Sequence, residues 1–161
     1  MVTDSDVWDY LEEVFDPEVP VLTVVELGIV QKVTVSNSSI HITITPTYSG
    51  CPAMQRIEDD IIEKLKEKCD FEVNVDLVLS PAWTTDWITE GGKQKLKAYG
   101  IAPPEEESDK SVLFAEQTIV PCPKCDCKDT KMISQFGSTA CKAHYQCNVC
   151  LEPFDYFKCL R

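Results

Sequence analysis

The chain has 161 residues, of which 43% are hydrophobic, and this composition excludes a wholly disordered protein. Its 27 acidic and 15 basic residues leave a net charge of −12, so it lacks the basic surface that nucleic acid and anionic membranes require. Its nine cysteines are an odd number that cannot all pair in disulfides, and no apolar run is long enough to span a bilayer. The acidic N-terminus has no features of a signal peptide, so we expect a cytoplasmic, thiol-reducing location.

The first elements follow directly from the hydrophobic pattern. Apolar residues at helical spacing predict a helix over residues 4–15, which Pro17 and Pro20 end. Two β-branched, roughly alternating segments, 29–35 and 39–45, flank the turn-forming sequence SNSS. They predict a β-hairpin.

The next three elements complete a small α+β domain. After a loop at 46–52, an apolar stripe predicts a second helix that begins at Pro52 and runs to about Lys68. Residues 71–79 predict a third strand, and residues 86–98 predict a shorter helix. The order α-β-β-α-β-α favours a three-stranded sheet with helices packed on one of its faces.

The composition changes after these elements. Residues 103–111 (PPEEESDKS) are charged, begin with prolines and lack apolar side chains, as a linker does. Seven of the nine cysteines lie in the last 40 residues. We therefore predict an α/β domain over 1–102, a linker over 103–115 and a cysteine-rich domain over 116–161.

Two C-x2-C pairs separated by 21 residues predict a metal site in the second domain. The four cysteines are Cys122, Cys125, Cys147 and Cys150. Two tight turns that each present two thiolates can form the tetrahedral shell that zinc prefers, and so short a segment needs a metal to fold. The strand-like segments 130–136 and 142–147 fit a zinc ribbon. An iron–sulfur cluster held by the same cysteines is the alternative.

Four further residues near these pairs are candidate metal ligands: Cys127, Cys141, His144 and Cys159. Cys127 is close enough in sequence to compete for the first site. Cys141 and Cys159 could form a second site with His144, but isolated cysteines more often pack as small apolar residues.

The first domain contains one cysteine in a suggestive position. Cys51 precedes Pro52 at the predicted start of a helix, where free N–H groups and the helix dipole would lower the pKa of the thiol. The resulting thiolate would bind soft metals or attack electrophiles. Asp16 and Glu18 flank Pro17 in a rigid turn and could bind metal or assist proton transfer. A buried inert cysteine and a solvated turn are the alternatives.

The chain resembles a known family in both parts. DPEVP (16–20), ELGIV (26–30), YSGCP (48–52) and PAWTTDW (81–87) resemble the iron–sulfur assembly domain of SufT-type and MIP-type factors. FGSTACKAHYQCNVCLEPFDYFKC (136–159) resembles the tail of the PaaD family, which is encoded with the multicomponent phenylacetyl-CoA epoxidase of aerobic phenylacetate breakdown. The resemblance covers nearly the whole chain except the linker.

The resemblance implies an accessory protein rather than an enzyme, which helps to mature or maintain the epoxidase system and above all its iron–sulfur reductase component. The family's hallmark cysteine matches Cys51 and its turn carboxylates match Asp16 and Glu18, which would handle iron or a transient cluster. One cysteine cannot complete a cluster's ligand set, so a homodimer, a client cysteine or a small thiol would supply the rest. Cys127 and His144 depart from the family's pattern.

Two other functions remain open. The ribbon and the acidic surface could hold the epoxidase complex together as a structural interaction module, while Cys51 only packs. A thiol enzyme that uses Cys51 is disfavoured, because His41 lies on a predicted strand and His144 lies in the ribbon, so neither is placed as a base.

Overall fold

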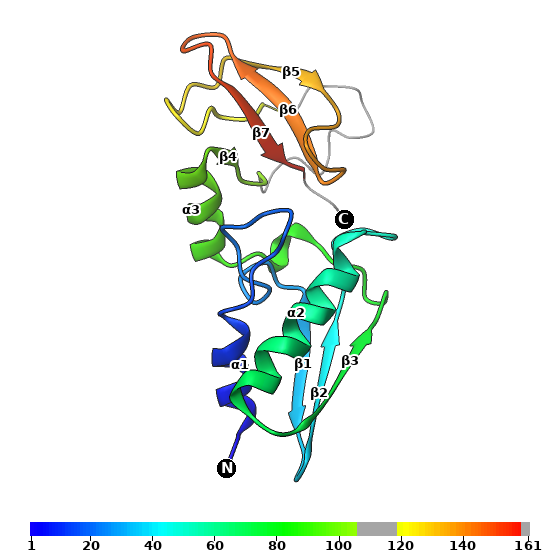
Figure 1. Cartoon of the computed structure of the whole chain (residues 1–161). Coiled ribbons are helices and arrows are strands. Elements are labelled where there is room, and N and C mark those ends of the chain that lie inside the picture. The colour runs from blue at the N-terminus through cyan, green and yellow to red at the C-terminus, as the bar shows by residue number, and fades with distance from the viewer. Residues whose placement is uncertain (106–118, 159–161) are drawn as a thin grey trace. The chain divides into compact units, whose positions relative to one another are not determined.

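The structure is a computed structural model that describes residues 1–105 and 119–158 (Figure 1). Contacts within the chain divide it into two compact units, Met1–Thr89 and Glu90–Arg161. Most of the predicted linker and the candidate ligand Cys159 lie outside the described residues. Within the described part of the chain, no helix is both long and apolar enough to traverse a bilayer.

The first unit is a three-stranded sheet with two helices on one face (Figure 1). Its elements are α1 (Asp4–Leu11), β1 (Val30–Val35), β2 (Ser39–Ile44), α2 (Ala53–Lys68), β3 (Glu72–Leu77) and the 3₁₀ helix η1 (Thr85–Trp87). The central strand β2 pairs antiparallel with β1 and parallel with β3. This arrangement confirms the predicted α+β fold and the hairpin.

Burial explains why these segments adopt their structures. Ile40, Ile42 and Ile44 alternate along β2 and are fully buried, so one face of the central strand forms the core. Ile57 and Ile61 of α2 are buried at helical spacing in the same unit. The sequence pattern of both elements therefore predicts the core correctly.

The first helix is shorter than its apolar periodicity predicts. It begins with a capping box, in which Thr3 Oγ1 accepts the N–H of Asp6 and the Asp6 carboxylate accepts the N–H of Thr3. It ends at Leu11, because the chain then turns and Phe15 forms an isolated antiparallel bridge with Thr23. Phe15 is 48% exposed and does not continue the buried stripe of α1.

The second unit has a four-stranded sheet in the order β4-β7-β6-β5. Its elements are α3 (Glu90–Tyr99), β4 (Ile101–Ala102), β5 (Thr130–Ser134), β6 (Lys142–Cys147) and β7 (Pro153–Phe157). β5, β6 and β7 are antiparallel, whereas β4 pairs parallel with β7. The ring of Tyr145 lies 5.9 Å from Phe154 and 5.7 Å from Tyr156, centroid to centroid, and these rings form the core.

The segment from Thr85 to Ala102 differs from the sequence prediction. The helix expected over 86–98 is interrupted, because η1 ends at Trp87 and the N–H of Thr89 donates to the carbonyl of Glu26 at 2.9 Å. The helix resumes at Glu90, in the second unit. The contacts therefore place α3 and β4 with the C-terminal sheet, whereas the sequence predicts a first domain over 1–102.

Candidate metal centre and cysteine loop

Cys51 lies in a tight turn between β2 and α2. Its backbone N–H donates to the carbonyl of Tyr48 at 3.2 Å, and its carbonyl accepts the N–H of Met54 at 3.3 Å. Gly50 has a φ of +77°, a conformation that glycine adopts without steric cost. The turn leaves the Cys51 side chain half-buried just before the first residue of α2.

The pKa of the Cys51 thiol is raised, so the predicted lowering by the helix N-terminus is wrong. Burial is the largest cause, and the negative charges of Glu18 and Asp16 raise the pKa further. Hydrogen bonds from the backbone N–H of Ala53 and the side chain of Tyr48 oppose the shift but do not outweigh it. The N–H group at the helix start therefore lowers the pKa of Cys51 as expected, but desolvation, with smaller contributions from the two carboxylates, outweighs this effect.

The fold places Asp16 and Glu18, from a distant part of the sequence, near enough to Cys51 for their charges to act on its thiol. The two carboxylates differ in their surroundings. Asp16 is buried, and its Oδ1 accepts the N–H of Glu18 at 2.7 Å and that of Val19 at 2.8 Å. Asp16 therefore stabilises the turn that carries it. Glu18 is only half-buried, and its charge acts on the Cys51 thiol slightly more than that of Asp16.

We expect Asp16→Ala to lower the free energy of unfolding by about 1–3 kcal/mol, because one buried and one partly buried N–H group lose their acceptor. Asp16→Asn is the matched control, since its amide oxygen can accept the same two hydrogen bonds without the charge. Urea unfolding of both variants measures the difference. An equal loss in the two variants would contradict the idea that the acceptor atom holds the turn.

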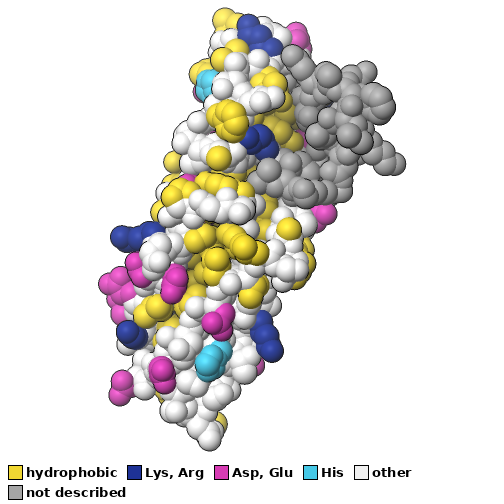
Figure 2. Space-filling model, turned by 90° about the vertical axis from the view of Figure 1, so that its right-hand side faces the viewer, with side chains coloured by type: hydrophobic (Ala, Val, Ile, Leu, Met, Phe, Trp, Pro, Cys, Tyr) yellow, Lys and Arg dark blue, Asp and Glu magenta, His cyan; other side chains and the backbone are white. Residues whose placement is uncertain are grey.

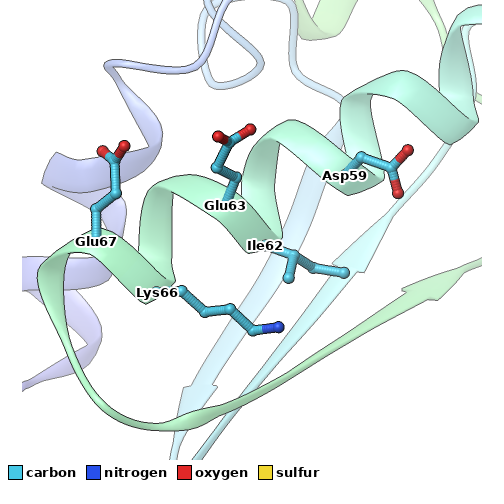
Figure 3. Close-up of a pocket in the computed structure, with 5 residues that line it drawn as sticks. All are labelled: Asp59, Ile62, Glu63, Lys66 and Glu67. Carbon is cyan, nitrogen blue, oxygen red and sulfur yellow. The ribbon is translucent and has the colours of Figure 1, made fainter.

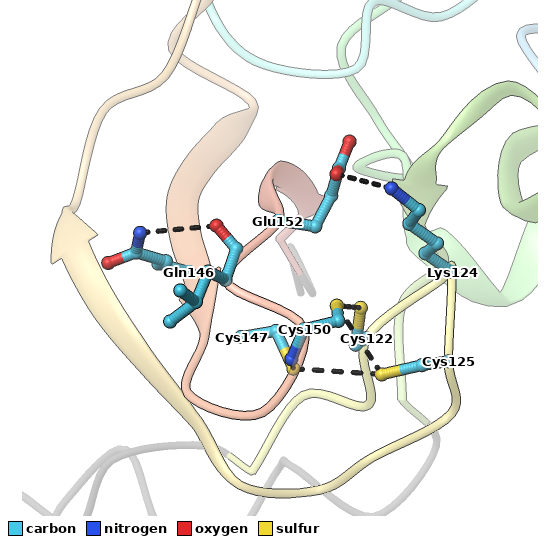
Figure 4. A network of polar contacts seen from close by, with 8 residues as sticks. Cys122, Lys124, Cys125, Gln146, Cys147, Cys150 and Glu152 are labelled. Carbon is cyan, nitrogen blue, oxygen red and sulfur yellow. Dashed lines mark hydrogen bonds and ion pairs between the residues drawn. The ribbon is translucent and has the colours of Figure 1, made fainter.

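The second unit gathers the four predicted cysteines into one group that could hold a metal ion: Cys122, Cys125, Cys147 and Cys150. Their ligand atoms all lie within 4.8 Å of one another, and three of the Sγ–Sγ distances are 3.5, 3.7 and 3.7 Å (Figure 4). Four thiolates at the zinc–sulfur bond length of about 2.3 Å would lie about 3.8 Å apart at the corners of a tetrahedron. The four sulfurs therefore fit a tetrahedral metal ion such as zinc.

The two C-x2-C turns have the same backbone design. The N–H of Cys122 donates to the carbonyl of Cys127 at 2.9 Å, and the N–H of Cys147 donates to the carbonyl of Glu152 at 3.0 Å. The residue after each pair has a left-handed backbone conformation, with a φ of 58° at Asp126 and 61° at Leu151. Sequence reasoning missed these two residues, although their equal position after each pair is a signal that could have identified them.

The electrostatics of the four thiols also suit a cation. The pKa of Cys147 is lowered to about 7, chiefly because the backbone N–H of Cys150 hydrogen-bonds to its sulfur. The backbone N–H of Cys127 likewise favours the thiolate of Cys125, but burial and the neighbouring thiols raise its pKa to about 12. Thiols that share one space cannot all ionise without a positive charge between them. A divalent cation would remove this conflict.

The three other candidate ligands within the described residues do not join this site. Cys127 contributes its sulfur as an acceptor for the N–H of Asp129, at 3.3 Å, and packs against the core. Cys141 is buried with its sulfur 3.0 Å from Thr139 Oγ1. His144 Nδ1 lies 3.3 Å from the carboxylate of Asp155. Within the described residues, only the four paired cysteines form a group that could hold a metal ion.

The helix α2 carries acidic and basic side chains on its exposed side. A surface hollow of about 450 Å³ lies there (Figure 3). It is lined by Asp59, Ile62, Glu63, Lys66 and Glu67. No cysteine takes part in it, so it is separate from the Cys51 turn.

Two family models match the chain. Residues 4–78 match the model described as iron-sulfur cluster assembly protein, and residues 106–158 match the PaaD zinc beta ribbon domain. The first match contains the Cys51 turn with its carboxylates, and the second contains all four paired cysteines. The resemblance drawn from the sequence motifs is therefore confirmed in both parts.

Individual relatives agree with these models. The chain is 47% identical over 155 residues to an Escherichia coli (strain K12) protein that is named as a putative subunit of 1,2-phenylacetyl-CoA epoxidase, and the match covers 96% of this chain and 92% of that protein. It is 33% identical over 90 residues to the Fe-S protein maturation auxiliary factor of Porphyromonas gingivalis, covering 55% of this chain and 85% of that protein.

A solved structure supports the fold of the first unit. The crystal structure of a domain of unknown function, DUF59, from Bacillus anthracis superposes with a TM-score of 0.55 at 31% identity, covering 58% of this chain and 90% of that one. The full-length match to the E. coli protein extends the relationship over both units. The chain therefore belongs to the PaaD family, with an iron–sulfur cluster assembly domain followed by a zinc beta ribbon.

Proposed function

We propose that the protein helps to mature or maintain the iron and iron–sulfur centres of a multicomponent phenylacetyl-CoA epoxidase, without catalysing its reaction. One observation carries the proposal: a half-buried cysteine lies beside two carboxylates, within a domain that matches the iron–sulfur cluster assembly model. The names of the relatives, an epoxidase subunit and an iron–sulfur maturation factor, support it.

The chemistry of the Cys51 turn suits transient binding. Because the pKa of Cys51 is raised, the free protein holds this thiol protonated at neutral pH. An iron ion or a cluster would displace the proton, and the same negative charges of Glu18 and Asp16 that disfavour the thiolate would favour the cation. A single thiolate ligand binds weakly and exchanges readily, which delivery to a client requires.

We propose a separate role for the second unit. Zinc would occupy the four-cysteine site as a structural ion, because a closed shell of four thiolates leaves no open position for chemistry. The folded ribbon would then dock a client, in the first place the iron–sulfur reductase component of the epoxidase. Within the described residues all eight cysteines are free thiols, which fits a cytoplasmic location.

Expression of the reductase component together with Cys51→Ala tests the cargo role. We expect the iron bound per reductase to fall to the level found without the accessory protein, because the only thiolate proposed to bind the cargo is lost. Cys69→Ala is the matched control: Cys69 is also a half-buried cysteine of the first unit, but it ends α2 and donates to the carbonyl of Leu65. Iron measured on the purified reductase decides the outcome, and an unchanged content with Cys51→Ala would remove this role.

A structural interaction module is the second candidate. The exposed apolar side chains of Val149 and Leu151, 65% and 66% exposed, favour it, because both lie on the second C-x2-C turn. In the same expression experiment, stable copurification of the reductase with the Cys51→Ala protein at full iron content would favour the module. Transient association with iron loss favours delivery.

A further inference from the structure

β3 is a sheet edge without the features that protect the other edges. The described residues contain four edge strands: β1, β3, β4 and β5. Exposed edges are normally blunted by bulges, lysines or very short strands. β1 has a bulge between Val30 and Lys32, β5 has one after Met132, and β4 is two residues long. β3 instead pairs with β2 over six residues without a shift of register and contains no lysine or proline.

The hydrogen-bonding groups of β3 alternate between its two sides. The N–H of Glu72 donates to the carbonyl of Ser38 at 3.0 Å, on the β2 side. The N–H and C=O of one residue point to the same side of a strand, and the side alternates along the chain. Val73, Val75 and Leu77, the outer row, therefore direct these groups away from the sheet. Within the described part of the chain, no strand takes them up.

The outer row is also apolar and incompletely covered. Its side chains share the sheet face of Ile40, Ile42 and Ile44, their register partners in β2. Yet Leu77 is 50% exposed, and Leu79, which follows the strand, is 60% exposed. Figure 2 looks onto this side of the first unit, where hydrophobic side chains gather between charged ones. The edge thus offers both unpaired backbone groups and an apolar row.

We propose that β3 pairs antiparallel with β3 of a second copy of this chain, about a two-fold axis at Val75. In this register Val75 lies opposite its own copy, and Val73 lies opposite the partner's Leu77. All of these pairs belong to the outer row, so each can exchange two N–H···O hydrogen bonds. The contact joins two three-stranded sheets into one continuous sheet and covers the apolar row of both copies.

The polar and charged side chains of β3 favour this register and are compatible with a second copy as the occupant. On the opposite face of β3, Asn74 would lie opposite the partner's Asp76, where an amide can donate to a carboxylate. A shift of the axis by one residue, to Asn74, would place Glu72 opposite the partner's Asp76, and directly opposed like charges are destabilising. A strand with two acidic residues can therefore pair with itself in the Val75 register.

This dimer goes beyond the proposed function and does not rest on it. Cys51 follows the C-terminal end of β2, which runs parallel to β3. Antiparallel pairing of the two β3 strands puts the two Cys51 turns at opposite ends of the joined sheet. The two cysteines could not ligate one cluster, so the dimer would leave a client cysteine or a small thiol to supply the missing ligands.

Sedimentation velocity of the full chain over a concentration series tests the dimer. Asn74→Lys would place an ammonium opposite each partner's Asp76, whereas Asn74→Asp would place a carboxylate there. Because each pair forms twice by symmetry, we expect the dissociation constant to fall roughly tenfold with lysine and to rise roughly tenfold with aspartate. Thr34→Lys and Thr34→Asp, on the exposed side of β1, are matched controls, and both should leave the dissociation constant unchanged.

The outcomes separate the possibilities. Opposite shifts with the two Asn74 variants would support the Val75 register. A monomer at every concentration, or a dimer that neither Asn74 variant affects, would overturn the proposal. If both variants weakened the dimer, Asn74 would have to lie opposite Asn74 of the second copy. That result would overturn the Val75 register. Iron content of a client reductase is a separate readout, so failure of the dimer leaves the proposed function unaffected.

Discussion

Cys147→Ser is expected to release the metal and unfold the second unit. The Cys147 side chain has 0% exposure, accepts the N–H groups of Val149 and Cys150, and lies 3.7 Å from Cys125. Structural zinc sites contribute about 10–16 kcal/mol of apparent binding free energy to small domains, which equals or exceeds the whole stability of a typical domain. A serine hydroxyl in place of this thiolate removes one of four ligands and leaves a polar group in the core.

Metal content and thermal unfolding of the full chain measure this effect. We expect about one zinc ion per chain in the unmodified protein and none in the Cys147→Ser protein. Cys141→Ala is the control, because Cys141 is also buried in the second unit but lies outside the four-thiol group. A Cys147→Ser protein that kept a full zinc ion would show that another ligand set holds the metal.

Gly28→Ala is expected to destabilise the first unit severely. Gly28 has a φ of +73°, and a Cβ at this position would lie 2.7 Å from Trp87 Cβ and still closer to the Trp87 carbonyl oxygen. The conformation and the collision with backbone atoms are both unfavourable. We expect a loss of more than about 3 kcal/mol in the free energy of unfolding.

Gly50→Ala separates the two causes of this loss. Gly50 has a nearly equal φ of +77°, but nothing lies within 4 Å of an added Cβ. We expect this variant to lose only about 1 kcal/mol, the cost of the left-handed conformation. Urea unfolding of both variants gives the difference that close packing against Trp87 contributes. Similar losses in the two variants would show that packing at Gly28 contributes little.

Sequence reasoning succeeded where the signal is local. β2 and α2 were predicted because their own periodicity, of two and of 3.6 residues, matches the face that each buries. The four paired cysteines were predicted because each C-x2-C turn presents its ligands by itself. This prediction required only the further assumption that the two turns meet. Sulfurs of different turns do lie 3.7 and 3.5 Å apart.

The sequence predictions failed where contacts between residues far apart in the sequence determine the local structure. The 86–98 helix is interrupted by a hydrogen bond from Thr89 to Glu26, far earlier in the sequence. β4 was missed because a two-residue strand exists only through its pairing with β7. The direction of the Cys51 pKa was wrong because burial, its largest cause, follows from the packing of the whole unit. The nearness of Cys51 to Asp16 and Glu18 was implied by the family resemblance alone.

The parallel pairing of β4 with β7 has a consequence for how this family can be divided into modules. The zinc ribbon model begins at residue 106, but the strand that completes the ribbon sheet lies before it, at Ile101–Ala102. A fragment that began at 106 would leave the outer edge of β7 open beside Phe154 and Tyr156 of the core. A ribbon transplanted to another protein should therefore carry the chain from Glu90 onward, because the helix and strand there belong to the same folding unit.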